Sequence, residues 1–207
     1  LPMSSENLAH DEYWTLAGRC SAELTEQRSR FLGVASPCGT QQELRALLDE
    51  VSAAQPGATH YCWAYRLGYP DHAQEHSSDA GEPAGTAGPP MAGVLAFHQL
   101  WNVAIIAVRH FGGVKLGIPG LQDAYRGIAR LTLAAGKAVL RRPMCALAFD
   151  MPYAAYNILE YHLKKCGGRW SGQAFGARVR GTAHVPRACA AEFEASARAA
   201  GAAPVHG

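Results

Sequence analysis

The sequence predicts an α+β protein that is built from two domains. The chain has 207 residues, a length that suits one large domain or two small ones. Strand-type and helix-type hydrophobic patterns occur in mixed order along it, and Arg141-Arg142-Pro143 ends a long helical pattern just before a new strand. We therefore expect one domain over residues 1–142 and a second over residues 143–207.

The first domain opens with two predicted strands, Thr15–Leu24 and Arg28–Ala35, around a turn at residues 25–27. A helix follows from Thr40, because Thr40 and Glu43 have the spacing of a capping box. One face of that helix is apolar at helical spacing, through Leu44, Leu47, Leu48 and Val51. Pro56-Gly57 should end it.

The middle of the first domain alternates between strands and helices. His60–Leu67 is rich in aromatic residues and alternates in polarity, as a strand does, and residues 68–88 form a long polar loop. A proline at the first helical position loses no needed hydrogen bond, so Pro89-Pro90 can start a helix that runs to about Trp101. Val103–Val108 is a short apolar run, typical of a strand buried on both faces. A long helix is expected over Leu121–Leu140.

The second domain reads strand, helix, strand, strand, helix. This is the order of a ferredoxin-like split βαβ domain, with a short strand at its end. The predicted elements are Cys145–Phe149, Tyr153–Lys165, Ala174–Arg180, Thr182–Pro186, Arg187–Ala200 and a stub in Ala203–His206.

Composition excludes several classes of protein. Nineteen basic and 17 acidic residues give a net charge of +2, so no global field selects a nucleic-acid or membrane partner. No apolar stretch is long enough for a transmembrane helix, and no signal peptide is visible, so we expect a cytoplasmic protein without a membrane partner. Six cysteines without a CxxC pair exclude a zinc ribbon.

Two glycine-rich segments are the main candidates for a binding site. Residues 77–88 precede a predicted helix, and residues 109–120 join a buried strand to another helix. Backbone N–H groups at such places can bind an anion, and Arg109 and Lys115 would add positive charge. Neither segment is a P-loop or a GxGxxG motif, and tight turns that need glycine are the alternative. The candidate residues are Asp79, Gly81, Glu82, Gly85, Thr86, Arg109, Gly112, Gly113 and Lys115.

Other patterns favour plain structural roles. The acidic and histidine residues between Asp71 and Glu82 resemble a metal cluster, but a solvated loop is the better interpretation, so we expect no metal and no cofactor. His60 and Cys62 share one strand face, where core packing is favoured over a nucleophilic pair. No serine, metalloprotease or kinase signature occurs, although acid–base chemistry by Asp79 and Glu82 stays open. Enzymatic activity is therefore uncertain, with binding favoured.

Basic residues are concentrated after the second glycine-rich segment. Residues 109–142 contain seven Lys or Arg against Asp123 alone. Four of the seven fall close to one helical stripe: Arg126, Arg130, Lys137 and Arg141. A solvated helix face explains such a stripe, and phosphate binding is the functional alternative. Arg126 and Arg130 complete the candidate binding residues.

The glycine-rich segments resemble a known family. SDAGEPAGTAGPPM (Ser78–Met91) and RHFGGVKLGIPGLQDAY (Arg109–Tyr125), with His60–Tyr65 upstream, are similar to the IMPACT/YigZ family. The resemblance covers most of Arg28–Leu140, and the remainder fits the small C-terminal domain of bacterial members. Three places depart from the family pattern: Ile118-Pro119 replaces a small residue and glycine, Asp123 a basic residue, and His110 a tyrosine.

The resemblance implies both fold and function. It implies an N-terminal domain like the second domain of a small-subunit ribosomal protein, a fold shared with domain IV of elongation factor G and with GHMP kinases. The C-terminal domain would resemble the last domain of elongation factor G. Eukaryotic relatives regulate translation initiation by competing for an activator of a stress kinase. We therefore expect a translation-linked regulatory or binding protein that contacts RNA, the ribosome or a protein partner through a glycine-rich, basic surface. The alternative is an enzyme that acts on a phosphorylated small molecule at the two glycine-rich segments. The sequence does not fix the oligomeric state.

Overall fold

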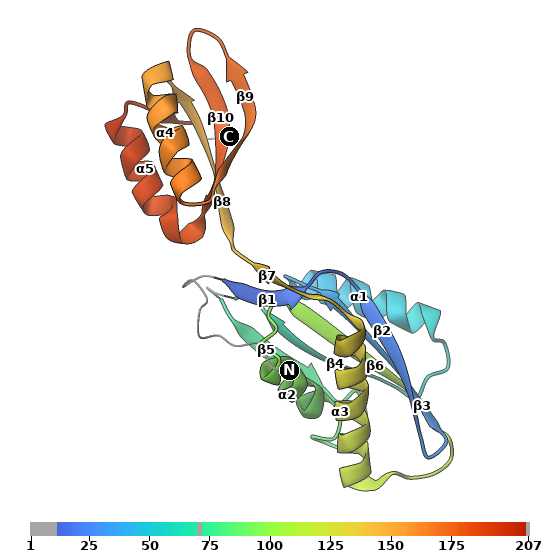
Figure 1. Cartoon of the computed structure of the whole chain (residues 1–207). Helices are drawn as coiled ribbons and strands as arrows, with labels where there is room; N and C mark the ends of the chain where they lie inside the picture. Colours follow the sequence, from blue (N-terminus) through green and yellow to red (C-terminus); the bar gives the residue numbers. More distant parts are fainter. Residues whose placement is uncertain (1–11, 70–71, 206–207) are drawn as a thin grey trace. The chain divides into compact units, whose positions relative to one another are not determined.

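The computed structural model describes residues 12–69 and 72–205 (Figure 1). The chain divides into two compact units, one formed mainly by Tyr13–Arg141 and the other by residues from Arg142 onward. Both units combine helices with antiparallel sheets, so the predicted α+β class is confirmed. Within the described ranges, no helix is long and apolar enough to cross a membrane.

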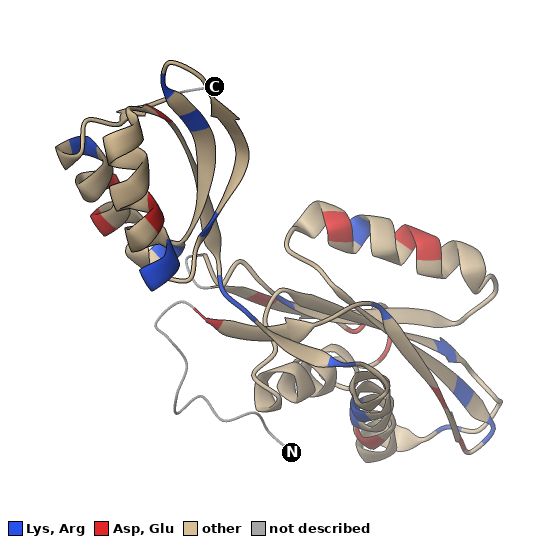
Figure 2. Ribbon diagram, turned by 45° about the horizontal axis from the view of Figure 1, so that its top comes forward, with Lys and Arg blue, Asp and Glu red and all other residues tan. Residues whose placement is uncertain are grey.

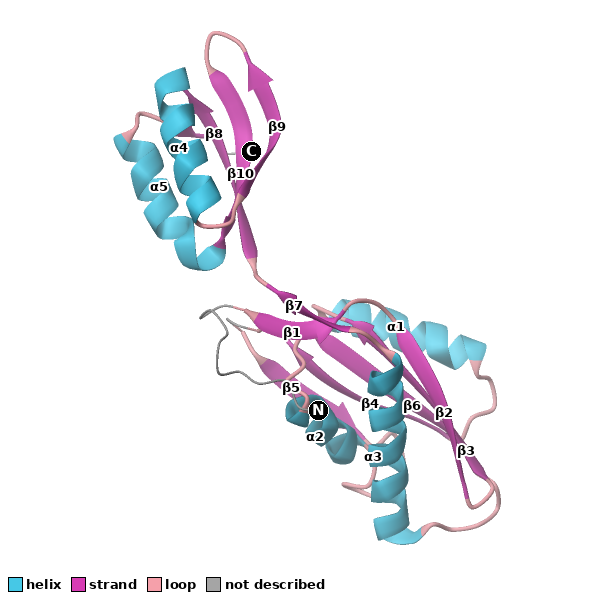
Figure 3. Cartoon of the chain, in the orientation of Figure 1, coloured by secondary structure: helices cyan, strands magenta, loops and turns pink. Residues whose placement is uncertain are grey.

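A five-stranded antiparallel sheet forms the centre of the first unit (Figure 3). Its strands, in spatial order, are β2 (Cys20–Glu26), β3 (Ser29–Pro37), β6 (Val103–His110), β4 (His60–Leu67) and β5 (Gln74–Ser78). Helices α2 (Gly88–Phe97) and α3 (Gly117–Ala135) pack on one face, and α1 (Gln41–Ala54) packs on the other. A separate ribbon pairs β1 (Tyr13–Leu16) with β7 (Ala138–Arg141).

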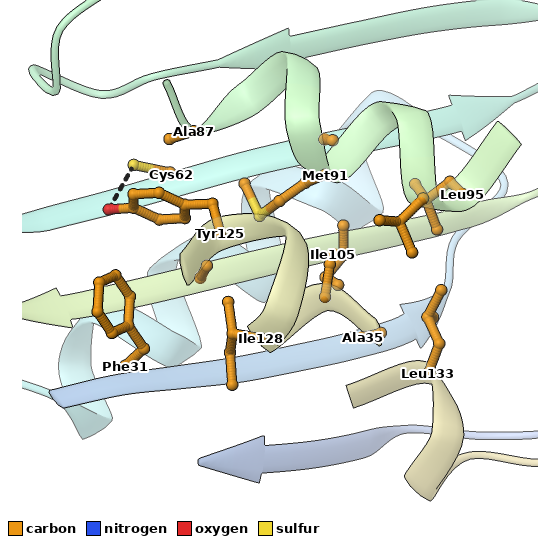
Figure 4. Close-up of a cluster of buried hydrophobic side chains, with 14 of the residues drawn as sticks. Phe31, Ala35, Cys62, Ala87, Met91, Leu95, Ile105, Tyr125, Ile128 and Leu133 are labelled. Atoms are coloured by element: carbon orange, nitrogen blue, oxygen red, sulfur yellow. Dashed lines mark hydrogen bonds between the residues drawn. The ribbon is translucent and has the colours of Figure 1, made fainter. Parts of the chain in front are cut away.

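Strand β6 is buried on both faces, as its apolar run predicts. Val103, Ile105 and Ala107 belong to the core beneath α2 and α3, whereas the alternate residues Ala104, Ile106 and Val108 belong to the core beneath α1. Figure 4 shows Ile105 in the first of these cores, with Met91 from α2 and Tyr125 and Ile128 from α3. The sheet therefore holds the α2–α3 layer in place through side chains of its central strand.

The predicted capping box starts α1. The backbone N–H of Glu43 donates to Thr40 Oγ1 over 3.2 Å, and Glu43 Oε2 accepts from the N–H of Gly39 over 2.6 Å. The first contact satisfies an N–H group that the first helical turn leaves without a carbonyl, and the second ties Glu43 to the residue just before the N-cap. Leu44, Leu47 and Val51 are buried as expected.

Four predicted elements of the first unit are wrong in extent. The helix expected from Pro89-Pro90 to about Trp101 is α2, which ends at Phe97. The polar loop at residues 68–88 contains β5, a polar edge strand that the sequence pattern does not distinguish from a loop. The predicted strand Thr15–Leu24 is two strands, β1 and β2. The helix expected over Leu121–Leu140 begins at Gly117 and ends at Ala135, because the following residues pair with β1 as β7.

Pro119 does not disturb α3. It occupies the first helical turn, where backbone N–H groups have no intrahelical acceptor. A proline there removes no hydrogen bond, so the departure from the family pattern at Ile118-Pro119 is compatible with an ordinary helix start.

The second unit has the ferredoxin-like topology. Its strand order is β11-β8-β10-β9, all antiparallel. The elements along the chain are β8 (Met144–Met151), α4 (Tyr153–Lys165), β9 (Arg169–Phe175), β10 (Val179–Pro186), α5 (Ala190–Ala199) and β11 (Ala203–Pro204).

Two boundaries in the second unit differ from the predictions. The strand predicted over Ala174–Arg180 is wrong, because β9 covers Arg169–Phe175 and the hairpin turn lies at residues 176–178. Gly181, taken from the sequence as the turn, lies inside β10 beside a register shift between Arg180 and Thr182. Glycine marks a strand irregularity as readily as a turn. The predicted helix Arg187–Ala200 starts as a short 3-10 turn over Arg187–Cys189. His206 lies outside the described residues.

Candidate functional site

The first glycine-rich segment folds around the carboxylate of Asp79. Asp79 Oδ1 accepts the N–H groups of Ala87 (2.8 Å) and Gly88 (2.9 Å), and Oδ2 accepts the N–H of Gly85 (2.8 Å). Ala87 and Gly88 lie at the start of α2, where backbone N–H groups lack helical acceptors, and Gly85 lies in the turn just before it. Partial burial would raise the pKa of Asp79, but the backbone hydrogen bonds outweigh it and hold that pKa below its ordinary value. The anion that this segment binds is therefore the protein's own side chain.

Glu82 and Arg109 form a buried ion pair between the two glycine-rich segments. Arg109 Nη1 lies 2.7 Å from Glu82 Oε1, and their side chains are 6% and 3% exposed. The same carboxylate oxygen accepts the hydroxyl of Tyr125 over 2.8 Å, and Arg109 Nη2 donates to Ser29 Oγ over 3.3 Å. The network joins the first segment to the end of β6, to β3 and to α3.

Cys62 joins this network through the hydroxyl of Tyr125. Its Sγ lies 3.4 Å from Tyr125 Oη, drawn as a dashed line in Figure 4, and 3.0 Å from the carbonyl oxygen of Asp79. Burial raises the pKa of the Cys62 thiol to about 12. His60 Nδ1 lies 3.0 Å from the carbonyl oxygen of Ala80, and because a carbonyl only accepts, this nitrogen carries the proton. Cys62 packs in the core as predicted and is held as a thiol, whereas the prediction is wrong for His60, which is only half-buried and lies at the edge of this network.

Several positions in the two glycine-rich segments require glycine for structural reasons. A Cβ added at Gly112 would lie 1.9 Å from the carbonyl oxygen of Arg28, so the backbones approach too closely for any side chain. Gly81, Gly85 and Gly113 have positive φ, a conformation that favours glycine. Thr86 is buried, and its hydroxyl donates to the carbonyl of Pro83 over 2.6 Å.

The acidic and histidine side chains between residues 72 and 82 contact different partners and do not form one cluster. Glu75 pairs with Arg66 over 2.8 Å, and the His76 ring lies against Tyr65. Asp79 and Glu82 have the partners described above, and Asp71 lies outside the described residues. Over the described part of the chain, no group of three or more His, Cys, Asp or Glu is arranged to hold a metal ion.

The prediction that four basic residues form one helical stripe is wrong. Arg126 and Arg130 lie on α3, but Lys137 follows the end of that helix and Arg141 belongs to β7. Arg126 also pairs with Asp123 over 2.7 Å. The helical periodicity continues past Gly136, which is why the pattern suggested a longer helix than the chain forms.

A groove of about 440 Å³ runs between α2 and α3, and it contains three of the candidate residues. Gly85, Arg126 and Arg130 line it, as does Gln122, whose side-chain amide donates to the Gly85 carbonyl over 3.2 Å. The remaining lining residues come from α2 and are Pro89, Pro90, Gly93, Val94 and Phe97. We call this the α2–α3 groove. Lys115 and Gly113 are exposed on the loop before α3 and do not line it.

Sequence reasoning missed the α2 side of this groove. A usable signal was present, since α2 reads GPPMAGVLAF and contains no charged side chain. Such a helix is expected to be buried all round. The structure instead leaves Phe97 58% exposed.

The fold and the site together define a two-domain α+β protein whose first domain is of the Impact N-terminal type, since residues 27–133 match that domain family. The chain is 32% identical over 170 residues to the IMPACT family member YigZ of Escherichia coli, covering 82% of this chain and 83% of YigZ. It is 39% identical over 113 residues to the IMPACT family member YvyE of Bacillus subtilis, covering 55% of this chain and 52% of YvyE. A solved structure described as a hypothetical protein matches with a TM-score of 0.69 and 28% identity, covering 95% of this chain and 98% of the other. The chain belongs to the IMPACT family.

Proposed function

We propose that this protein is a non-catalytic binding protein in translation-linked regulation, and that its partner docks at the α2–α3 groove. One observation carries the proposal. The side chains of Asp79, Glu82 and Arg109 are hydrogen-bonded or ion-paired inside the protein. The α2–α3 groove, in contrast, presents two arginines beside an apolar wall. The link to translation rests on the resemblance to eukaryotic relatives, and it implies a cytoplasmic protein.

The state of the internal groups argues against the enzyme alternative. A nucleophile or general base must reach a substrate with a suitable pKa. Cys62 is fully buried with its pKa raised to about 12, and Glu82 is held by Arg109 and Tyr125. The N–H groups that would bind a substrate phosphate in the first segment are bound to Asp79. Among the described residues lining the α2–α3 groove, only Arg126 and Arg130 are charged.

A cell-free translation reaction tests the proposal. Purified full-length protein is titrated into a bacterial extract, and the yield of a luciferase reporter is measured. We expect the wild-type protein to change the yield and Arg126→Glu/Arg130→Glu to lose that effect. Arg45→Glu is the matched control, because Arg45 is exposed on α1 across the sheet from the groove.

Two results would contradict the proposal. An unchanged yield at every concentration of wild-type protein would remove the link to translation. Equal effects of the wild-type protein and the Arg126→Glu/Arg130→Glu variant would move the docking site away from the α2–α3 groove.

A further inference from the structure

We propose that the α2–α3 groove binds a short peptide segment of a partner protein in which an apolar, preferably aromatic, side chain lies close to two or more acidic residues. The inference deepens the function proposed above, since it names the chemistry of the partner at that surface. It rests on the two contrasting walls of the groove.

The α2 wall lacks the polar surface of an ordinary exposed helix. Figure 2 shows α2 without any charged residue, and its sequence offers no hydrogen-bonding side chain. Met91 and Leu95 are fully buried beneath it, but Pro89, Gly93 and Phe97 face the groove and are exposed. Burying apolar surface of this kind is favourable, because it removes that surface from water. A helix that is apolar all round needs a cover, and a ligand with an apolar side chain would supply it.

The α3 wall supplies positive charge that is available to a ligand. Arg126 and Arg130 are one helical turn apart, so both guanidinium groups can reach one short segment. Arg130 is exposed, and the pair of Arg126 with Asp123 lies at the surface, where the Asp123 side chain is 77% exposed. A surface pair of this kind is worth little, so a ligand carboxylate can replace Asp123 at small cost. Carboxylates suit arginine through paired, charge-assisted hydrogen bonds.

The same geometry favours a peptide over RNA. Nucleic-acid affinity comes mainly from contacts to many phosphates, each of which uses a basic group. The groove has two such groups, and the predicted stripe that would have extended them does not exist. Four of the nine lining residues have apolar side chains (Pro89, Pro90, Val94 and Phe97), and these have no role in holding a phosphate backbone. An acidic segment with an apolar anchor complements both walls at once.

Gly93 provides a way to close the groove without damaging the fold. It lies in the middle of α2, lines the groove, and has no heavy atom within 4 Å of an added Cβ. A side chain is therefore sterically tolerated, and replacing a glycine within a helix improves helix propensity. Gly93→Gln should fold at least as well as the wild type while filling the groove.

The test uses a phage library of random dodecapeptides, panned in parallel on immobilised full-length wild type and Gly93→Gln. We expect peptides retained by the wild type alone to combine Phe, Leu or Trp with two or more Asp or Glu. As synthetic fluorescein-labelled peptides, they should bind Arg130→Ala at least about thirtyfold more weakly, the size of a hot-spot contact. Arg45→Ala should bind them as the wild type does.

Several results would overturn the inference. One is that no peptide binds the wild type in preference to Gly93→Gln. Another is that the peptides with this preference contain no acidic residues. A third is that a labelled single-stranded RNA dodecamer binds the groove and peptides do not. The outcome is separable from the translation assay. An effect on translation that requires the groove, without acidic peptides binding there, would leave the proposed function standing and reject this inference. Binding of acidic peptides at the groove without any effect on translation would support this inference and reject the proposed link to translation.

Discussion

The guanidinium of Arg109 and the carboxylate of Glu82 lie 2.7 Å apart in the interior of the first unit, although each comes from a glycine-rich segment that looks like a surface loop in sequence. Glu82 is the second residue of the GEPAGTAG run, and Arg109 is near the end of β6. Removing two charges from water is costly unless they pair closely. The contact therefore fixes the first segment against the sheet, next to the start of α2.

Loss of one partner of this pair should be strongly destabilising. Glu82→Ala leaves the buried Arg109 without a counter-charge, which typically costs about 3–5 kcal/mol. Glu82→Met/Arg109→Met removes both charges and should recover a large part of that loss. Urea unfolding followed by circular dichroism measures both. A loss below about 1 kcal/mol for Glu82→Ala, the range of a surface pair, would show that the pair is not buried in solution.

Asp79 should stabilise the protein in a pH-dependent way. Its folded-state pKa is lowered, so its contribution is fully present above the pKa of the unfolded chain and disappears as the pH falls through the folded-state value. Asp79→Ala, which frees the N–H groups of Ala87 and Gly88, should cost about 1–2 kcal/mol at pH 7, the range of a lost helix cap. At pH 3 the difference from wild type should shrink. A difference that stays constant between pH 3 and pH 7 would contradict the role of the carboxylate.

Two glycines should respond in opposite directions to alanine. Gly112→Ala places a Cβ 1.9 Å from the Arg28 carbonyl oxygen, so the β2–β3 turn must move and the free energy of unfolding should fall. Gly93→Ala meets no atom within 4 Å and should raise that free energy by up to about 1 kcal/mol. Thermal unfolding of both variants tests the pair. Equal melting temperatures for the two would contradict the close approach at Gly112.

We also propose that the first unit folds by itself when it keeps β7. Among the residues that the structure describes, none beyond Ala138 belongs to its cores, and β7 pairs with β1 over Tyr13–Leu16. A fragment of residues 1–141 should unfold cooperatively, whereas a fragment that ends at Gly136 loses β7 and should be less stable. Aggregation of the longer fragment would show that the second unit completes its fold.

RNA binding should be weak and only slightly dependent on salt. With Arg126 and Arg130 as the available cations of the groove, at most two phosphate contacts form, which predicts about a tenfold loss of affinity between 50 and 200 mM salt. Fluorescence anisotropy with Arg126→Ala/Arg130→Ala alongside measures this slope. A slope corresponding to four or more contacts would restore a phosphate-binding surface on this protein.

Much of the fold follows from local patterns that the sequence displays. The capping box at Thr40, the apolar run of β6 and the helix Tyr153–Lys165 are set by neighbouring residues, and the structure contains each of them. The strand β5 could not be predicted because its polar residues look like a loop, although its partner β4 directly precedes it in the chain. The strand β7 could not be predicted because it is short and pairs with β1 at the other end of the unit's sequence. Pairing partners are a tertiary property that periodicity does not encode.

The candidate site was predicted less well than the fold. Asp79, Glu82 and Arg109 were selected because charged residues among glycines suggest a ligand, and all three instead satisfy groups of the protein itself. Arg126 and Arg130 were selected for their charge and do line the α2–α3 groove. Phe97 was missed, because an apolar residue on a helix looks like core until the neighbouring elements are placed.

Gly93→Gln in the cell-free translation reaction tests the central claim most directly, because it closes the α2–α3 groove without removing any contact of the fold. The account predicts that this variant unfolds at the same or a higher temperature than the wild type and loses the effect on reporter yield. A folded Gly93→Gln protein that changes the yield as the wild type does would contradict the assignment of the groove as the functional surface.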